Sequence, residues 1–321
     1  MFPNRAIAGV LMTMAAAGGA LASAGRQTGG QPPIGVGQVP SPLPLSNVIR
    51  ERGSSVTPAF EGWYRDKDGS VRFLVGYLNR NTKQEFDIPA GPDNRVEPCD
   101  PDQGQPTHFN PGRQWGVFTI KVPKDLGNKK MSWTIVANGF TNTVSLHTRP
   151  EWIVEPYEDA AQKNTPPVLR FEPEGPSFTG PPSTTAMTYT ATAGEPLALT
   201  TWVTDEGPKL NIPPPAAATG RGRGRGRGGA ADAEAFPPQP PLLITWTVFR
   251  GPGTVKFEPA RLPFDSPKGG KVTTTATFTA PGAYILRVEG NDSSGVGGSG
   301  FQCCWTNAHV AVIVKPGPAT K

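Results

Sequence analysis

The sequence has few of the residues from which catalytic and metal sites are usually built. Its 321 residues include three histidines and three cysteines, and neither His-Glu-x-x-His nor Gly-x-Ser-x-Gly occurs. These absences exclude the common zinc-peptidase and serine-hydrolase signatures. Hydrophobic residues are 36% and charged residues 18% of the chain, which are low values for one large globular core. We therefore expect a noncatalytic protein that holds no cofactor and no metal.

Long apolar runs are also missing. Beyond the N-terminal region no segment is apolar enough to cross a membrane, since a spanning helix needs about 20 apolar residues. The first residues instead follow the pattern of a secretory signal: Arg5, a weakly apolar run over 6–21, and the cleavage motif Ala22-Ser23-Ala24. We expect a signal peptide over 1–24 and a flexible tether over 25–46. The mature chain would be exported to the periplasm, the cell surface or the exterior, without a transmembrane segment.

The net charge of +5 is not spread over the expected domains. One positive charge is Arg5, and four more lie in a Gly-rich run: Arg221, Arg223, Arg225 and Arg227. The other basic residues balance the 26 acidic ones. The run belongs to a Pro-, Ala- and Gly-rich segment, 208–241, that has too few apolar residues to offset the entropy of ordering, and we expect a disordered insertion. Four arginines with no aromatic residue between them predict no nucleic-acid partner.

What the sequence has in abundance is glycine and proline, 39 and 38 residues, which favours many turns over long helices. Short stretches of alternating apolar residues predict strands. A Gly-ended turn, Asp66-Lys67-Asp68-Gly69, comes before one of these stretches and predicts a β-hairpin. The alternating residues after it are Val71, Phe73, Val75 and Tyr77. We expect a β-sandwich of unknown family over 47–156 and a linker over 157–167.

A second set of alternating stretches lies between residues 168 and 315. Segment 244–257 resembles the middle of PKD-like and related immunoglobulin-like domains, and segment 275–292 resembles their E–F corner and the strand after it. The Trp-Asp-Phe-Gly-Asp-Gly signature of many PKD domains is absent. The resemblance implies a noncatalytic module of exported or surface proteins. It also implies that Trp246 is the core tryptophan and that Tyr284 forms a tyrosine corner, its hydroxyl bonded to nearby backbone.

The predicted fold class is therefore all-β, with two tandem immunoglobulin-like antiparallel β-sandwich domains. The signal peptide precedes them, the disordered Arg-Gly insertion interrupts the second domain, and residues 316–321 form a tail.

One long loop of the first domain, 89–113, is the best place for a ligand patch. His108, Phe109 and Trp115 would supply aromatic and polar groups. The competing interpretation is a Pro-rich cover with Phe109 packed against the sheet. Calcium is not expected at the acidic turn, because the twelfth position counted from Asp66 is Tyr77, where a calcium loop needs glutamate.

The three cysteines allow three interpretations. Cys303 and Cys304 precede the last strand, at the end of the second domain that should face the first, so either could bond to Cys99 in the long loop. A bond between the two neighbours would be strained, since adjacent Cα atoms lie about 3.8 Å apart. The third possibility is three unpaired thiols, with Cys303 and Cys304 buried beneath Trp305.

Together these features predict an exported, noncatalytic binding or scaffolding protein of the cell envelope or exterior. Its partner would be an envelope polysaccharide or another surface protein. The alternative is a secreted hydrolase with a site around the His108 loop.

Overall fold

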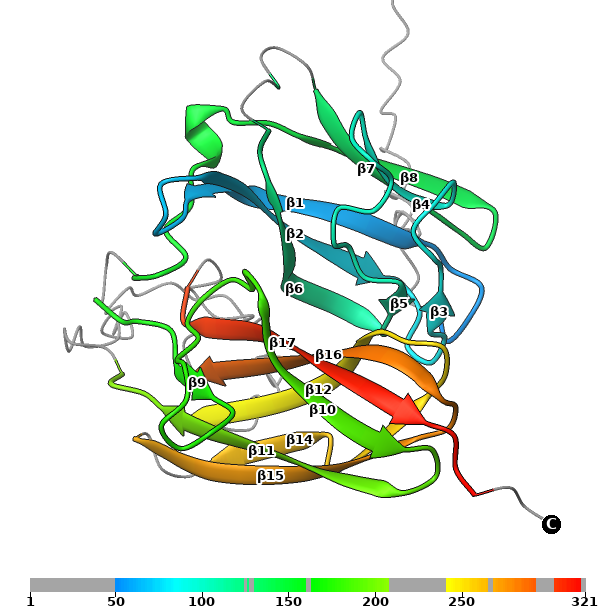
Figure 1. Ribbon diagram of the computed structural model, residues 1–321. Helices are drawn as coiled ribbons and strands as arrows, with labels where there is room; N and C mark the ends of the chain where they lie inside the picture. Colours follow the sequence, from blue (N-terminus) through cyan, green and yellow to red (C-terminus); the bar gives the residue numbers. More distant parts are fainter. Residues whose placement is uncertain are drawn as a thin grey trace, which may run out of the picture. The chain divides into compact units, whose positions relative to one another are not determined.

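The computed structural model describes residues 50–123, 126, 130–159, 163–207, 241–264, 268–292 and 303–318. Within these ranges the regular structure is β, apart from one 3-10 turn, η1 (Pro150–Trp152) (Figure 1). The predicted all-β class is confirmed. The predicted signal peptide and tether, and the insertion up to residue 240, lie outside the described residues. No helix of the described part is long and apolar enough to span a bilayer.

The strand pairs described in the first sandwich are antiparallel. One sheet has the order β1-β2-β6, another the order β4-β7-β8, and β3 pairs with β5. The strands are β1 (Val56–Arg65), β2 (Val71–Asn79), β3 (Phe86–Asp87), β4 (Asn94–Glu97), β5 (His108–Phe109), β6 (Gly112–Lys121), β7 (Met131–Ala137) and β8 (Phe140–Leu146). The predicted hairpin joins β1 to β2, and its alternating residues Phe73, Val75 and Tyr77 are buried.

The second sandwich consists of the sheets β13-β15-β11-β9 and β10-β17-β16-β12-β14. Its strands are β9 (Val168–Arg170), β10 (Thr185–Thr192), β11 (Pro196–Thr204), β12 (Leu242–Arg250), β13 (Val255–Glu258), β14 (Arg261–Phe264), β15 (Gly269–Phe278), β16 (Gly282–Asp292) and β17 (Trp305–Lys315). Trp246 lies in the core at 1% exposure, and the Tyr284 hydroxyl donates to Ala280 O at 2.8 Å. The core tryptophan and the tyrosine corner are thus where the resemblance implied.

One strand pair departs from the antiparallel prediction. β10 runs parallel to β17, whereas β9 pairs with β11 in the other sheet. The chain between β9 and β10 contains Gly180 and two prolines, Pro181 and Pro182, and it is long enough to cross the roughly 10 Å between packed sheets. The first two strands of this domain, β9 and β10, therefore lie at the edges of different sheets.

Two β-bulges place polar groups between the sandwiches. Glu61 is the extra residue of β1 between Phe60 and Gly62, and β6 has a bulge opposite Gly76 that contains Gly116. Glu61 Oε2 accepts the Gly116 N–H at 2.7 Å, and its Oε1 accepts from Arg113 Nη2 at 2.7 Å. Burial raises the pKa of Glu61, although Arg113 and the Gly116 N–H act in the opposite direction.

The bulge of β6 also meets the second sandwich directly. Arg287 of β16 donates to Trp115 O at 3.0 Å and to Gln114 Oε1 at 2.7 Å, and Asn307 Nδ2 donates to Gly116 O at 3.0 Å. Apolar packing reinforces these bonds, because Phe249 of β12 belongs to the core cluster of the first sandwich. Both sandwiches lie within one compact unit of the chain, Val48–Lys321.

Candidate functional site

The three residues of the predicted ligand patch make different contacts in the structure. Phe109 is fully buried and packs edge-on against Tyr77, with ring centroids 5.0 Å apart. His108 is 6% exposed, and its Nδ1 lies 2.8 Å from Asp87 Oδ1 across the β3–β5 pair. Trp115 lies on β6, where the Arg113 guanidinium stacks on its ring at 3.8 Å. Phe109 therefore contributes to the core of the first sandwich.

The cysteines are also separated. The loop of Cys99 contacts the Arg250 end of β12, where Asp102 pairs with Arg250 at 2.7 Å. Cys304 lies at the opposite end, since its carbonyl accepts the N–H of Asp292, the residue that pairs with Leu242. These contacts place the Cys99 loop and Cys304 near opposite ends of β12.

Two acidic turns, 66–69 and 100–102, have structural roles. Asp68 accepts the Ser70 N–H at 2.8 Å, which closes the hairpin turn, and Asp102 holds Arg250. Hydrogen bonds from Ser70 lower the pKa of Asp68. No group of three or more His, Cys, Asp or Glu side chains is placed to hold a metal ion in the part of the chain that the structure describes.

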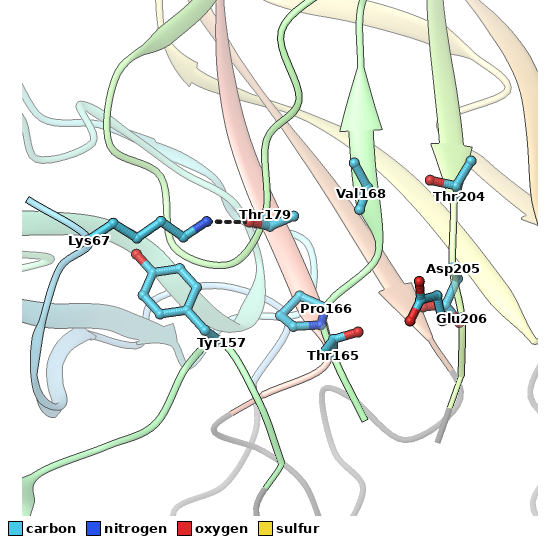
Figure 2. Close-up of a pocket in the computed structure, with 9 residues that line it drawn as sticks. All are labelled: Lys67, Tyr157, Thr165, Pro166, Val168, Thr179, Thr204, Asp205 and Glu206. Atoms are coloured by element: carbon cyan, nitrogen blue, oxygen red, sulfur yellow. Dashed lines mark hydrogen bonds between the residues drawn. The ribbon is translucent and has the colours of Figure 1, made fainter. Parts of the chain in front are cut away.

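A cleft of about 480 Å³ is the strongest candidate for a binding site. It brings together the β1–β2 turn, the segment predicted as a linker, and the ends of β9 and β11 (Figure 2). Its lining residues are Lys67, Tyr157, Thr165, Pro166, Val168, Thr179, Thr204, Asp205 and Glu206. A second cavity of about 220 Å³ adjoins it and shares Lys67, Tyr157 and Thr179. We refer to the larger cavity as the cleft.

One side of the cleft carries a fixed cation and an aromatic ring. Lys67 Nζ donates to Thr179 Oγ1 at 3.2 Å and lies 5.0 Å from the centre of the Tyr157 ring. Tyr157 is held by its hydroxyl, which donates to Asp66 Oδ1 at 2.9 Å, and by edge-on packing on Tyr64. Burial, followed by the bond to Asp66, raises the pKa of the Tyr157 hydroxyl. This side of the cleft is therefore preorganised by the first sandwich.

The opposite side carries two carboxylates, Asp205 and Glu206, directly after β11 (Figure 2). The Oδ1 atom of Asp205 is buried, and within the described residues it has no hydrogen-bond partner. Burial, and then the negative charge of Asp292, raise the pKa of Asp205 to about 6. This side therefore offers acceptors, one of which lacks a donor.

Asp205 gives a pH-dependent prediction. Because its folded-state pKa is about 6 and its ordinary value is 3.8, protonation favours the folded state, and the free energy of unfolding should fall as the pH rises from about 4 through 6. Asp205→Asn removes the ionisable group. We expect this variant to gain stability relative to the parent protein across that interval, measured by urea unfolding at each pH.

Asp68→Asn is the matched control, because the pKa of Asp68 is lowered and its contribution has the opposite sign. This variant should lose stability relative to the parent protein as the pH rises through the acid range. If the free energies of unfolding of the parent protein and the Asp205→Asn variant change with pH in parallel, the raised pKa of Asp205 is contradicted.

The cleft residues had no joint signal in the sequence. Lys67 lies in a turn, Tyr157 in a segment predicted as a linker, and Asp205 just before the predicted insertion. In the described part of that segment, Asn164 has no exposed surface and its Nδ2 donates to Asp292 Oδ2 at 2.6 Å. Only the contact between the two sandwiches brings these three segments together.

Comparisons with known proteins assign the chain to no family. No family model matches the chain, and no curated protein matches it. Among solved structures, the chain is similar to domains 1–6 of the surface layer protein SbsC, with 11% identity over 83% of this chain and 28% of that one, at a TM-score of 0.22. It is also similar to the titin Ig tandem domains A164-A165, with 10% identity over 82% and 100% of the two chains, at a TM-score of 0.20.

The chain thus spans less than a third of the surface layer protein it matches. The immunoglobulin-like β-sandwich class stands on the strand order and on the tyrosine corner. No family model supports the narrower PKD-like assignment.

Proposed function

We propose that this chain is an exported, noncatalytic protein of the cell envelope or exterior. Its two sandwiches would act as one rigid scaffold, and its cleft would bind a polyhydroxylated chain such as an envelope polysaccharide. The observation that carries the proposal is the cleft itself, in which groups from both sandwiches face one space.

Rigidity between the sandwiches supports the scaffolding part. Arg287 is 4% exposed and bonds groups of both sandwiches, and Trp305 of β17 packs with Tyr64 and Leu74 of the first sandwich. A tandem joined only by a free linker would allow the two domains to move, whereas buried polar and aromatic contacts oppose such motion. A fixed geometry between the sandwiches is what a cleft between them requires.

The chemistry of the cleft supports a sugar ligand. The carboxylates of Asp205 and Glu206 can accept hydrogen bonds from neighbouring hydroxyl groups, and Lys67 can donate to ring oxygens or to an acidic substituent. Pro166 and Val168 add apolar surface for the C–H face of a sugar ring. A cation on one side and acceptors on the other fit a polysaccharide that carries both carboxylate and hydroxyl groups.

Binding of an acidic polysaccharide tests the proposal. The full mature chain should bind polygalacturonate more tightly than uncharged dextran, as measured by affinity electrophoresis and calorimetry. Lys67→Met should weaken binding to polygalacturonate by about tenfold, since loss of one charge-assisted hydrogen bond is worth about 1.5 kcal/mol or more.

Lys271→Met is the matched control. Lys271 also lies over an aromatic ring, 5.5 Å from the centre of Trp202, but it does not line the cleft. This variant should bind like the parent protein. Equal losses of affinity in both variants would contradict binding in the cleft. Absence of polysaccharide binding, combined with capture of another envelope protein, would favour a protein partner.

A further inference from the structure

The two cysteines before β17 have an unusual backbone. Successive side chains of an extended strand point to opposite faces, so neighbouring cysteines normally hold their sulfur atoms apart. Here the Sγ atoms of Cys303 and Cys304 lie 2.8 Å apart. Cys304 has φ +73°, in the left-handed region that a residue with a side chain seldom adopts. This local turn brings both sulfurs to the same side of the chain.

The surrounding structure holds this turn in place. The Cys304 carbonyl accepts the Asp292 N–H at 3.2 Å, and Cys303 Sγ lies 3.7 Å from Asn164 O. Trp305, the next residue, is 1% exposed and packs in a cluster with Tyr64. Anchored on both sides, the pair keeps a backbone that would be unfavourable in an isolated peptide.

Each of the two sulfurs has the other as its nearest cysteine partner. Cys303 and Cys304 are 2% and 0% exposed, so the thiol of a second molecule cannot reach them in the folded chain. Cys99 lies in the loop that contacts the far end of β12. The disulfide that this fold favours is therefore the one between Cys303 and Cys304, whose Sγ atoms are already adjacent.

We propose that Cys303 and Cys304 are a covalent modification site, which closes to a vicinal disulfide when the chain folds in the presence of a small-molecule disulfide oxidant such as oxidised glutathione. One thiolate attacks the oxidant and releases one molecule of reduced thiol. The second cysteine then attacks the resulting mixed disulfide and releases another. The two cysteines lose two hydrogens in total, the oxidant becomes two thiols, and the new S–S bond closes a ring that includes the peptide bond between them.

Closure must precede or accompany burial. The neighbouring Cys304 and the loss of solvent raise the pKa of the Cys303 thiol in the folded chain, and a protonated thiol is a poor nucleophile. Adjacent Cα atoms are closer than the usual disulfide range, so the ring is strained and is reduced more readily than an ordinary structural disulfide. The enclosed turn protects the ring from reductants after folding. Export, as proposed above, would supply the oxidising compartment, but the chemistry does not depend on the cleft or its ligand.

The experiment uses the full chain with Cys99→Ser, so that only the pair can react. The reduced, unfolded protein is refolded with a mixture of reduced and oxidised glutathione, denatured without reductant, alkylated and digested. We expect no alkylated cysteine and a peptide spanning both cysteines that is two hydrogens lighter than the reduced form. Treatment with dithiothreitol before alkylation should give two labelled cysteines.

Two comparisons keep the test decisive. With Cys99→Ser and Cys303→Ser together, Cys304 has no partner and should be labelled or carry glutathione. In the unaltered chain, which avoids any folding defect of the variants, the same light peptide should appear and should not be linked to the Cys99 peptide. Two labelled cysteines in a folded Cys99→Ser protein, or a Cys99-linked peptide in the unaltered chain, would overturn the proposal.

Discussion

Gly116→Ala should lower the free energy of unfolding by about 3 kcal/mol or more. A Cβ added to Gly116 would lie 2.0 Å from Cη2 of Trp305, and two more atoms of that ring would be within 2.7 Å. The ring has little room to retreat, because Trp305 is 1% exposed and packs against Tyr64, Leu74 and Val154. Overpacking of a core costs about 1–3 kcal/mol, and the left-handed backbone of Gly116, φ +52°, adds about 1–2 kcal/mol.

Gly69→Ala separates these two costs. Gly69 has φ +77° in the β1–β2 turn, and a Cβ there would meet no atom within 4 Å. Only the backbone cost of about 1–2 kcal/mol should therefore appear in this variant. Urea unfolding of both variants measures the difference. If the two alanine variants lose the same free energy, the packing of Trp305 on Gly116 does not hold the sandwiches together.

Loss of Arg287 should cost about 3–5 kcal/mol of unfolding free energy, which is the usual effect of removing one partner of a buried charged network. Its guanidinium donates to Asn307 Oδ1 at 2.7 Å, Gln114 Oε1 at 2.7 Å and Trp115 O at 3.0 Å, and it pairs with Glu289. Arg287→Met keeps much of the side-chain volume but leaves these acceptors and a partly buried carboxylate without a donor. The measurement is again urea unfolding.

Two further variants define the origin of this loss. Arg287→Lys should recover little, because a single ammonium cannot reproduce the planar set of donors that reaches both sandwiches. Lys256→Met breaks the ion pair between Lys256 and Glu258, whose side chains are 69% and 58% exposed, respectively. This variant should change the free energy of unfolding by less than about 1 kcal/mol. A loss for Arg287→Met no greater than that for Lys256→Met would show that the network is not needed for stability.

The fold class and several local features follow from neighbouring residues in the sequence. Alternation in Val71, Phe73, Val75 and Tyr77 is a property of neighbouring residues, so it identified β2 and the hairpin before it. The corner around Tyr284, which the family resemblance implied, is also local, since the Tyr284 hydroxyl bonds a carbonyl only four residues away. Period-two patterns and turn residues determine which face of a strand is apolar, and they require no knowledge of the partner sheet.

Where those faces meet depends on the tertiary packing. Arg287 contacts a carbonyl 172 residues earlier in the chain, and the cleft joins Lys67 to Thr179 over 112 residues. The parallel edge of β10, the bulge at Gly116 and the separation of Cys99 from Cys304 likewise depend on how the two sandwiches and their sheets pack. Such contacts arise from complementary shape and charge between surfaces, and a one-dimensional pattern records which residues are polar or apolar but not which distant residue each one will face.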